Sequence, residues 1–158
     1  MHRQRGRQRG RRRVPSSAAA AIAREWALQL VSAEYLPTGR SEAELFLRGQ
    51  TDRLLGVLFD EPLYLQPARQ VGADLAGFGA TSSEALKQTL LVLGDHLLDD
   101  LPVRPVAGRY RLTHLLAEVA AGWADAVRED ILAEQEAVHR AVDVAREKEQ
   151  KADPPSNP

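Results

Sequence analysis

Apolar residues recur every three to four positions along most of the chain, which is the spacing of one face of an α-helix. This spacing predicts helices over about residues 17–33, 41–59 and 67–77, another that begins near residue 82 and stops by residue 101, and a long one over about residues 109–147. No useful length alternates apolar with polar residues, as a half-buried strand does. The sequence therefore predicts an all-α fold, a bundle of about five helices that ends in a long C-terminal helix.

The larger apolar residues predict which helix faces meet in the core. Trp26 and Leu30 share a face of the first helix, which Leu28 and Val31 are expected to widen, and Leu91 is expected beside the core face of the fourth helix. Other residues predicted to line the core are Ala18, Ile22, Ala33, Leu47, Leu54, Leu55, Leu58, Val71, Leu75, Phe78, Leu86, Leu90, Leu93, Leu97, Leu98, Leu112, Leu116, Val119 and Trp123.

Short polar motifs predict where helices begin and end. Ser41 with Glu44, and Thr81 with Glu84, have the spacing of a capping box, in which a hydroxyl and a carboxylate each accept a backbone amide at a helix start. Gly79 follows the third helix, where a residue that tolerates positive φ is common. The sequence therefore predicts two capping boxes and one glycine helix end.

The last part of the long helix has a different pattern from the rest. Ile131, Val138 and Ala145 recur at seven residues, and Val127 and Ala141 lie on the companion row, which Glu134 interrupts. A seven-residue apolar repeat is typical of a coiled coil. These five apolar residues are therefore the predicted interface of a homodimer.

Four segments follow from these patterns. Residues 1–15 are expected to form a disordered arginine-rich arm, residues 16–126 a helical bundle domain, residues 127–148 a projecting coiled-coil-like helix, and residues 149–158 a disordered tail. No apolar run approaches the roughly 20 residues that a membrane-spanning helix needs, so we expect no membrane insertion. The chain has no cysteine, which agrees with a reducing cytoplasmic location.

The formal net charge of −1 conceals an asymmetric distribution. The seven arginines of the arm leave about −8 on all other residues, so the folded body should not attract nucleic acid. Three interpretations of the arm stay open: phosphate binding on nucleic acid, attachment to an anionic membrane surface, or untranslated sequence from a misassigned start. The arginines concerned are Arg3, Arg5, Arg7, Arg9, Arg11, Arg12 and Arg13.

Candidate catalytic or ligand-binding chemistry is sparse. Gly77 and Gly79 form a Gly-x-Gly that follows a helix rather than a strand, so a helix end is favoured over a phosphate-binding loop. His96 and His114 lie on different predicted helices and leave a metal or haem site as an alternative, but the sequence has no His-x-x-x-His pair. Carboxylates near His96 come from Asp95, Asp99 and Asp100. We predict no catalytic residue, no metal and no cofactor.

Trp26 and Trp123 each lie on the apolar face of a predicted helix. Large aromatic side chains on such a face more commonly anchor a core than form a ligand cage. We therefore predict a structural role for both.

The chain resembles a known family at a set of helical segments. The resemblance covers about residues 20–147 and lies in residues 35–37, 41–44, 47–54, 71–75, 84–90 and 132–137. In these segments the chain is similar to the N-terminal helical region of actinobacterial cyclic-di-GMP signalling proteins, those with PAS, GGDEF and EAL domains downstream. More remotely, it is similar to the N-terminal domains of stressosome co-antagonists.

The resemblance implies a dimeric regulatory input domain that passes a signal along its last helix, with a signalling protein as a possible partner. It supplies no ligand and no functional residue. No GGDEF or EAL sequence occurs in the chain, so the chain would be either a fragment or a free-standing relative, and neither cyclase nor phosphodiesterase activity is expected. The expected function is a non-catalytic sensory module; the alternative is a small nucleic-acid-associated protein that binds through its arginine arm.

Overall fold

The computed structural model describes residues 16–99 and 105–152. Within these ranges the chain forms five α-helices and no strand. The helices are α1 (Ser16–Ala33), α2 (Arg40–Phe59), α3 (Gln66–Gly77), α4 (Ser83–His96) and α5 (Pro105–Ala152). The prediction of an all-α bundle with a long C-terminal helix is confirmed.

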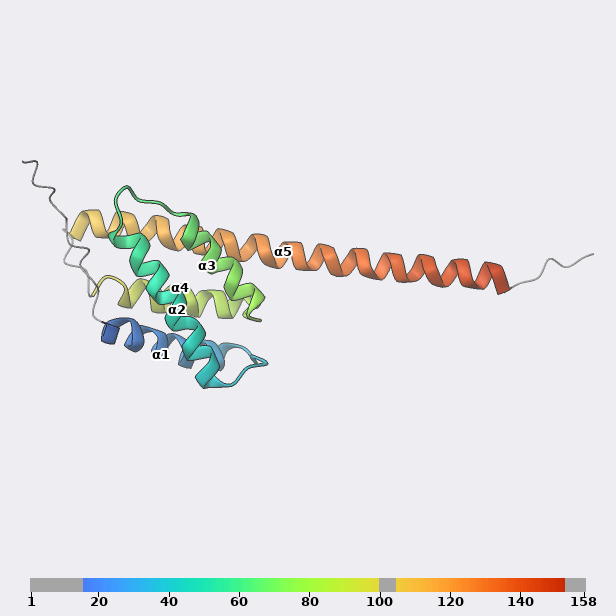
Figure 1. The fold of residues 1–158 in the computed structure, drawn as a ribbon, viewed down its shortest axis with the longest axis horizontal. Helices are drawn as coiled ribbons and strands as arrows, with labels where there is room; N and C mark the ends of the chain where they lie inside the picture. Colours follow the sequence, from blue (N-terminus) through green and yellow to red (C-terminus); the bar gives the residue numbers. More distant parts are fainter. Residues whose placement is uncertain (1–15, 100–104, 153–158) are drawn as a thin grey trace, which may run out of the picture.

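The bundle gathers around the first half of α5. Helix α3 packs against α5, α4 contacts both α1 and α5, and α2 contacts α1, α3 and α5. Figure 1 shows α1, α4 and α5 side by side, with α2 and α3 lying across them, while the second half of α5 extends away from all the others. The molecule is therefore a compact head with one projecting helix.

Small alanine side chains occupy several core positions, and some larger apolar residues that were predicted to be buried are exposed. Trp26 is fully buried and its indole N–H donates to the hydroxyl of Thr89 on α4 at 3.0 Å. Leu28, Val31 and Leu91, which were predicted to face the core, are exposed. That prediction is wrong because small residues let the helices approach closely and take the interior positions. In α1 these are Ala19, Ala23 and Ala27, and in α4 Ala85.

The start of α2 differs from the predicted capping box. The helix begins at Arg40 after Gly39, and no side chain accepts a hydrogen bond at this N-cap. Ser41 therefore lies inside the first turn, where it cannot serve as N-cap. The capping-box prediction at this site is wrong by two residues, because the glycine ends the preceding loop earlier than the hydroxyl motif suggested.

The start of α4 has a capping arrangement that joins two helices. Ser82 is the N-cap, and its hydroxyl accepts from the amide of Ala85 at 3.1 Å. The amide of Ser82 donates to the carboxylate of Glu34, just after α1, at 3.1 Å, and the hydroxyls of Ser82 and Thr81 donate to the same carboxylate. Glu84, the predicted partner, instead accepts from Lys87 and Gln88. The predicted capping box of Thr81 and Glu84 is therefore wrong: Ser82 is the N-cap, and Glu34, 48 positions away, accepts its amide.

The end of α3 follows the prediction. Gly79 has φ +106°, a conformation that side-chain-bearing residues rarely adopt. Its amide donates to the carbonyl of Ala76, and the amide of Ala80 donates to the carbonyl of Leu75. These two bonds form a Schellman motif, which satisfies the last carbonyls of the helix. The Gly-x-Gly is thus a helix end.

Helix α5 is longer than the sequence pattern predicted, because it begins at Pro105 and runs without a break to Ala152. Proline is well tolerated in the first turn, where its missing N–H has no intrahelical partner. Residues 149–152 belong to the helix rather than to a disordered tail, since no proline or glycine stops it before residue 153. Among the described residues, no helix is both long and apolar enough to cross a membrane.

Candidate interaction helix

The second half of α5 is not buried by any of the residues that the structure describes. Every residue from Arg128 to Ala152 is exposed, whereas Val119 and Leu115 in the first half are fully buried. Ile131 keeps 50% of its surface exposed and Val138 keeps 62%. The first half of α5 is thus packed in the core of the bundle, and the second half is exposed.

The exposed half still carries an apolar stripe. Spacings of three, four and seven residues return to the same side of a helix, so the predicted interface residues share one side. These residues are Val127, Ile131, Val138, Ala141 and Ala145. Val142 extends the same side and was missed, since it lies beside the seven-residue row rather than on it.

Part of this stripe has the form of a coiled-coil hole. A shallow depression on the helix is lined by Ile131, Glu134, Gln135, Val138 and His139. Positions i, i+3, i+4 and i+7 are the four residues that surround a knob from a partner helix. Four of the five lining residues have this spacing.

The buried half of α5 is held against α3 by two glycines. A Cβ on Gly122 would lie 2.8 Å from the carbonyl carbon of Arg69, and a Cβ on Gly72 would lie 2.7 Å from the amide nitrogen of Trp123. Neither distance leaves room for a methyl group. The backbones of α3 and α5 are thus in direct contact at a crossing where both helices lack side chains.

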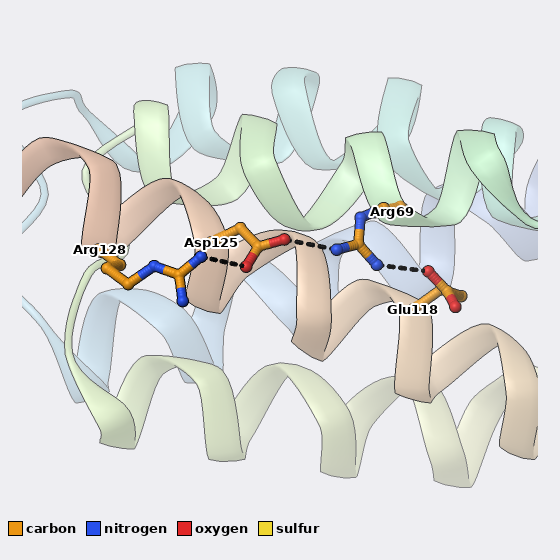
Figure 2. A network of polar contacts seen from close by, with 4 residues as sticks. All are labelled: Arg69, Glu118, Asp125 and Arg128. Carbon is orange, nitrogen blue, oxygen red and sulfur yellow. Dashed lines mark hydrogen bonds and ion pairs between the residues drawn. The ribbon is translucent and has the colours of Figure 1, made fainter.

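An arginine spans the same crossing from the outside. Figure 2 shows the guanidinium of Arg69 between two carboxylates of α5: it donates to Glu118 at 3.0 Å on one side and to Asp125 on the other. Asp125 also accepts from Arg128 at 3.3 Å. The hydrogen bonds from Arg69 to Glu118 and then Asp125 raise the pKa of the guanidinium above its ordinary value, so it stays charged. Glu118 and Asp125 lie about one turn before and one turn after Gly122, so the two ion pairs of Arg69 lie on either side of the close contact between α3 and α5.

Further hydrogen bonds from Arg111 and Trp123 fix the two ends of the packed half. Near its beginning, Arg111 donates to the carbonyls of Leu58 and Asp60 at 3.0 and 2.9 Å, which are the unsatisfied acceptors at the end of α2. Near its other end, the indole N–H of Trp123 donates to the carbonyl of Ala80 at 2.6 Å. Trp123 is partly rather than fully buried, and its polar edge ties α5 to the loop before α4.

The predicted alternatives for chemistry find little support in the arrangement. Among the described residues, no group of three or more histidines and acids could hold a metal. The ring of His114 packs against Tyr110 on its own helix, with centroids 4.3 Å apart, and Asp95 and Asp99 are exposed. Asp100 and the seven arginines of the arm lie outside the described residues.

The close contact between α3 and α5 was not predicted from the sequence, although one of its residues was conspicuous there. Gly122 is the only glycine after residue 108, and an isolated glycine in a strong helix commonly marks a close approach of another backbone. Gly72 and Arg69, on the α3 side of the crossing, have no such signal in the sequence, because their roles depend on which helix lies opposite them.

Comparison of the chain with protein-family models, curated proteins and solved structures found no match.

Proposed function

We propose that this chain is a non-catalytic regulatory module that associates through the projecting half of α5. The observation that carries the proposal is the apolar stripe on residues 127–145, which is exposed from Ile131 onward, on a helix whose other half is firmly packed in the bundle. An apolar stripe on a helix with a polar opposite face is the pattern of a helix that pairs with another.

Helix energetics support association. An isolated helix is marginal in water, and most helical stability in proteins comes from packing of an amphipathic face. Residues 128–152 have no such packing against the other described residues, yet they have no proline or glycine and carry several apolar side chains. A partner helix along the stripe would supply the missing packing.

Regulation would come from the way the bundle holds α5. Packed helices shift between discrete arrangements rather than deforming continuously, and the close approach of the two backbones at Gly72 and at Gly122 leaves no space for small adjustments. A shift of α5 along α3 must break the bonds from Arg69 to Glu118 and Asp125. An effector that binds one arrangement of the bundle better than the other would therefore change the position of the projecting helix.

The resemblance to the input regions of cyclic-di-GMP signalling proteins supports the same class of function, in a cytoplasmic setting and with a signalling protein as partner. A nucleic-acid-associated role through the arginine arm is the alternative, favoured by seven arginines within the first thirteen residues.

Sedimentation of the full chain and two variants tests the proposal. The full chain should be dimeric at tens of micromolar, and Ile131→Asp with Val138→Asp should give a folded monomer. The matched control is Leu132→Asp, because Leu132 is 52% exposed, close to the 50% of Ile131, but lies off the stripe. Leu132→Asp should remain dimeric. A full chain that is monomeric at these concentrations contradicts the proposal.

A further inference from the structure

We infer that the helix that covers the stripe is α5 of a second copy of this chain, running antiparallel to the first. The inference rests on the proposed association through α5 and specifies its partner and orientation. Three features of the exposed half support it: the distribution of large and small residues, the charges within the stripe, and the charges that flank it.

The sizes of the stripe residues change along the helix. Val127 and Ile131 lie near the bundle, whereas Ala141 and Ala145 lie toward the far end. A parallel pair would place each alanine against its own copy and leave a gap there, because facing positions pack well when a large residue meets a small one. An antiparallel pair can place each of these alanines against a larger residue of the other helix.

The charges within the stripe also disfavour a parallel pair. Continuing the seven-residue pattern places Glu134 and Lys148 on the companion row. In a parallel pair, each of these would face its own copy, and like charges directly opposite each other are destabilising. An antiparallel pair separates the two glutamates and the two lysines.

One antiparallel register satisfies the stripe. It places Ala141 of one helix against Val138 of the other, and Ala145 against Glu134. Ala145 then enters the depression lined by Ile131, Glu134, Gln135 and Val138. The same register puts the aliphatic stem of Lys148 on Ile131, and long stems of this kind cover apolar surface well.

The flanking positions pair in the same register. Arg128 of one helix lies beside Glu149 of the other, and Asp130 lies beside Lys151, and the twofold symmetry repeats both pairs. Arg128 is 71% exposed, so its guanidinium is accessible to a partner. In a parallel pair the corresponding flanking positions bring Asp130 to Gln135 and Val144 to Glu149, neither of which is an ion pair.

This register also uses the whole exposed half. It overlaps the two helices from Val127 to Ala152, so the end of each helix lies beside the edge of the other bundle. Residues 128–152 are the exposed ones, and a longer overlap would bring the helix end onto the partner's bundle. The projecting length thus matches the length that an antiparallel copy covers.

Disulfide exchange between two single-cysteine chains tests orientation and register, since the chain has no cysteine of its own. Glu134→Cys and Ala145→Cys chains, one with a mass tag, are mixed and equilibrated in a glutathione buffer. The antiparallel register brings these two positions together, whereas identical positions lie 11 residues apart, or about 16 Å, beyond disulfide reach. The mixed disulfide should therefore dominate. Leu132→Cys with Asp143→Cys, both exposed and off the stripe, is the control and should show no enrichment.

Each other result overturns a specific part of the inference. Homodisulfides of each chain in a sedimenting dimer would show a parallel pair and leave the proposed association intact. A dimer with neither disulfide enriched would overturn the register. A monomer at every concentration would overturn the inference together with the proposed function.

Charge exchange gives a second readout. Arg128→Glu should weaken the dimer about tenfold, because it turns two attractive pairs into repulsive ones. Adding Glu149→Arg should restore the affinity. A double variant no tighter than Arg128→Glu alone would contradict the pairing of these two positions.

Discussion

The contact between α3 and α5 makes a sharp prediction about Gly122→Ala. Alanine has a higher helix propensity than glycine, by about 1 kcal/mol, so the change should stabilise an ordinary exposed helix. At this position the new methyl carbon would lie 2.8 Å from the carbonyl carbon of Arg69 and 3.1 Å from its Cα. Both are backbone atoms, so no side chain can rotate away, and the two helices must separate.

The expected loss follows from that separation. Adding a methyl group to a well-packed interior costs about 1 to 3 kcal/mol, and this site lies at the upper end, because the obstacle is backbone. After the gain in propensity, Gly122→Ala should lower the free energy of unfolding by about 2 kcal/mol. Separation also lengthens the 3.0 Å bond from Arg69 to Glu118, which would add to the loss.

Urea unfolding followed by circular dichroism at 222 nm measures the effect, at one fixed protein concentration because association adds to stability. The matched control is Gly49→Ala in α2, where a Cβ meets nothing within 4 Å. Gly49→Ala should raise the free energy of unfolding by about 0.5 to 1 kcal/mol. If Gly122→Ala were as stable as Gly49→Ala, the backbones of α3 and α5 could not be in contact, and the reasoning above would be refuted.

Three further predictions concern the helix ends and the arm. Glu34→Ala should lower the free energy of unfolding by about 1 kcal/mol, as loss of a helix cap does, and more than Glu84→Ala in the same urea assay, since Glu34 joins two helices. Hydrogen bonds from Gln88 and then Lys87 lower the pKa of Glu84. The stability they give is present above about pH 4.3 and is lost as pH falls through the lower folded-state value; carboxyl NMR titration of the Gln88→Ala variant should show the pKa of Glu84 rising. Deleting residues 1–15 should leave Tm nearly unchanged and abolish any DNA binding that collapses between low and physiological salt. Salt-resistant binding by the truncated chain would instead favour the nucleic-acid alternative.

The sequence alone determined those features that depend on local spacing. Five helices, the glycine end of α3 and the burial of Trp26 follow from apolar periodicity and from the conformation that Gly79 needs. The apolar stripe on the last helix could also be predicted, because its residues share one side of the helix whatever lies opposite them. These features require only the geometry of a single helix.

The tertiary structure decided the features that depend on which helix lies opposite. Leu28 and Val31 face outward although their size suggested the core, because alanine faces allow α1 to approach α2 and α4 closely. Glu34 rather than Glu84 accepts the amide at the start of α4, since the fold brings α1 to that point. No local pattern encodes such a partner.

The same reason separates the two halves of α5. Periodicity makes both halves amphipathic, and the sequence pattern cannot by itself state where packing within the chain stops. In the structure, burial of α5 by the bundle ends near Val127, a little more than one turn after the close contact with α3 at Gly122. The sequence thus determined that the last helix has a face to cover, and the tertiary structure decided that the bundle covers only the first half.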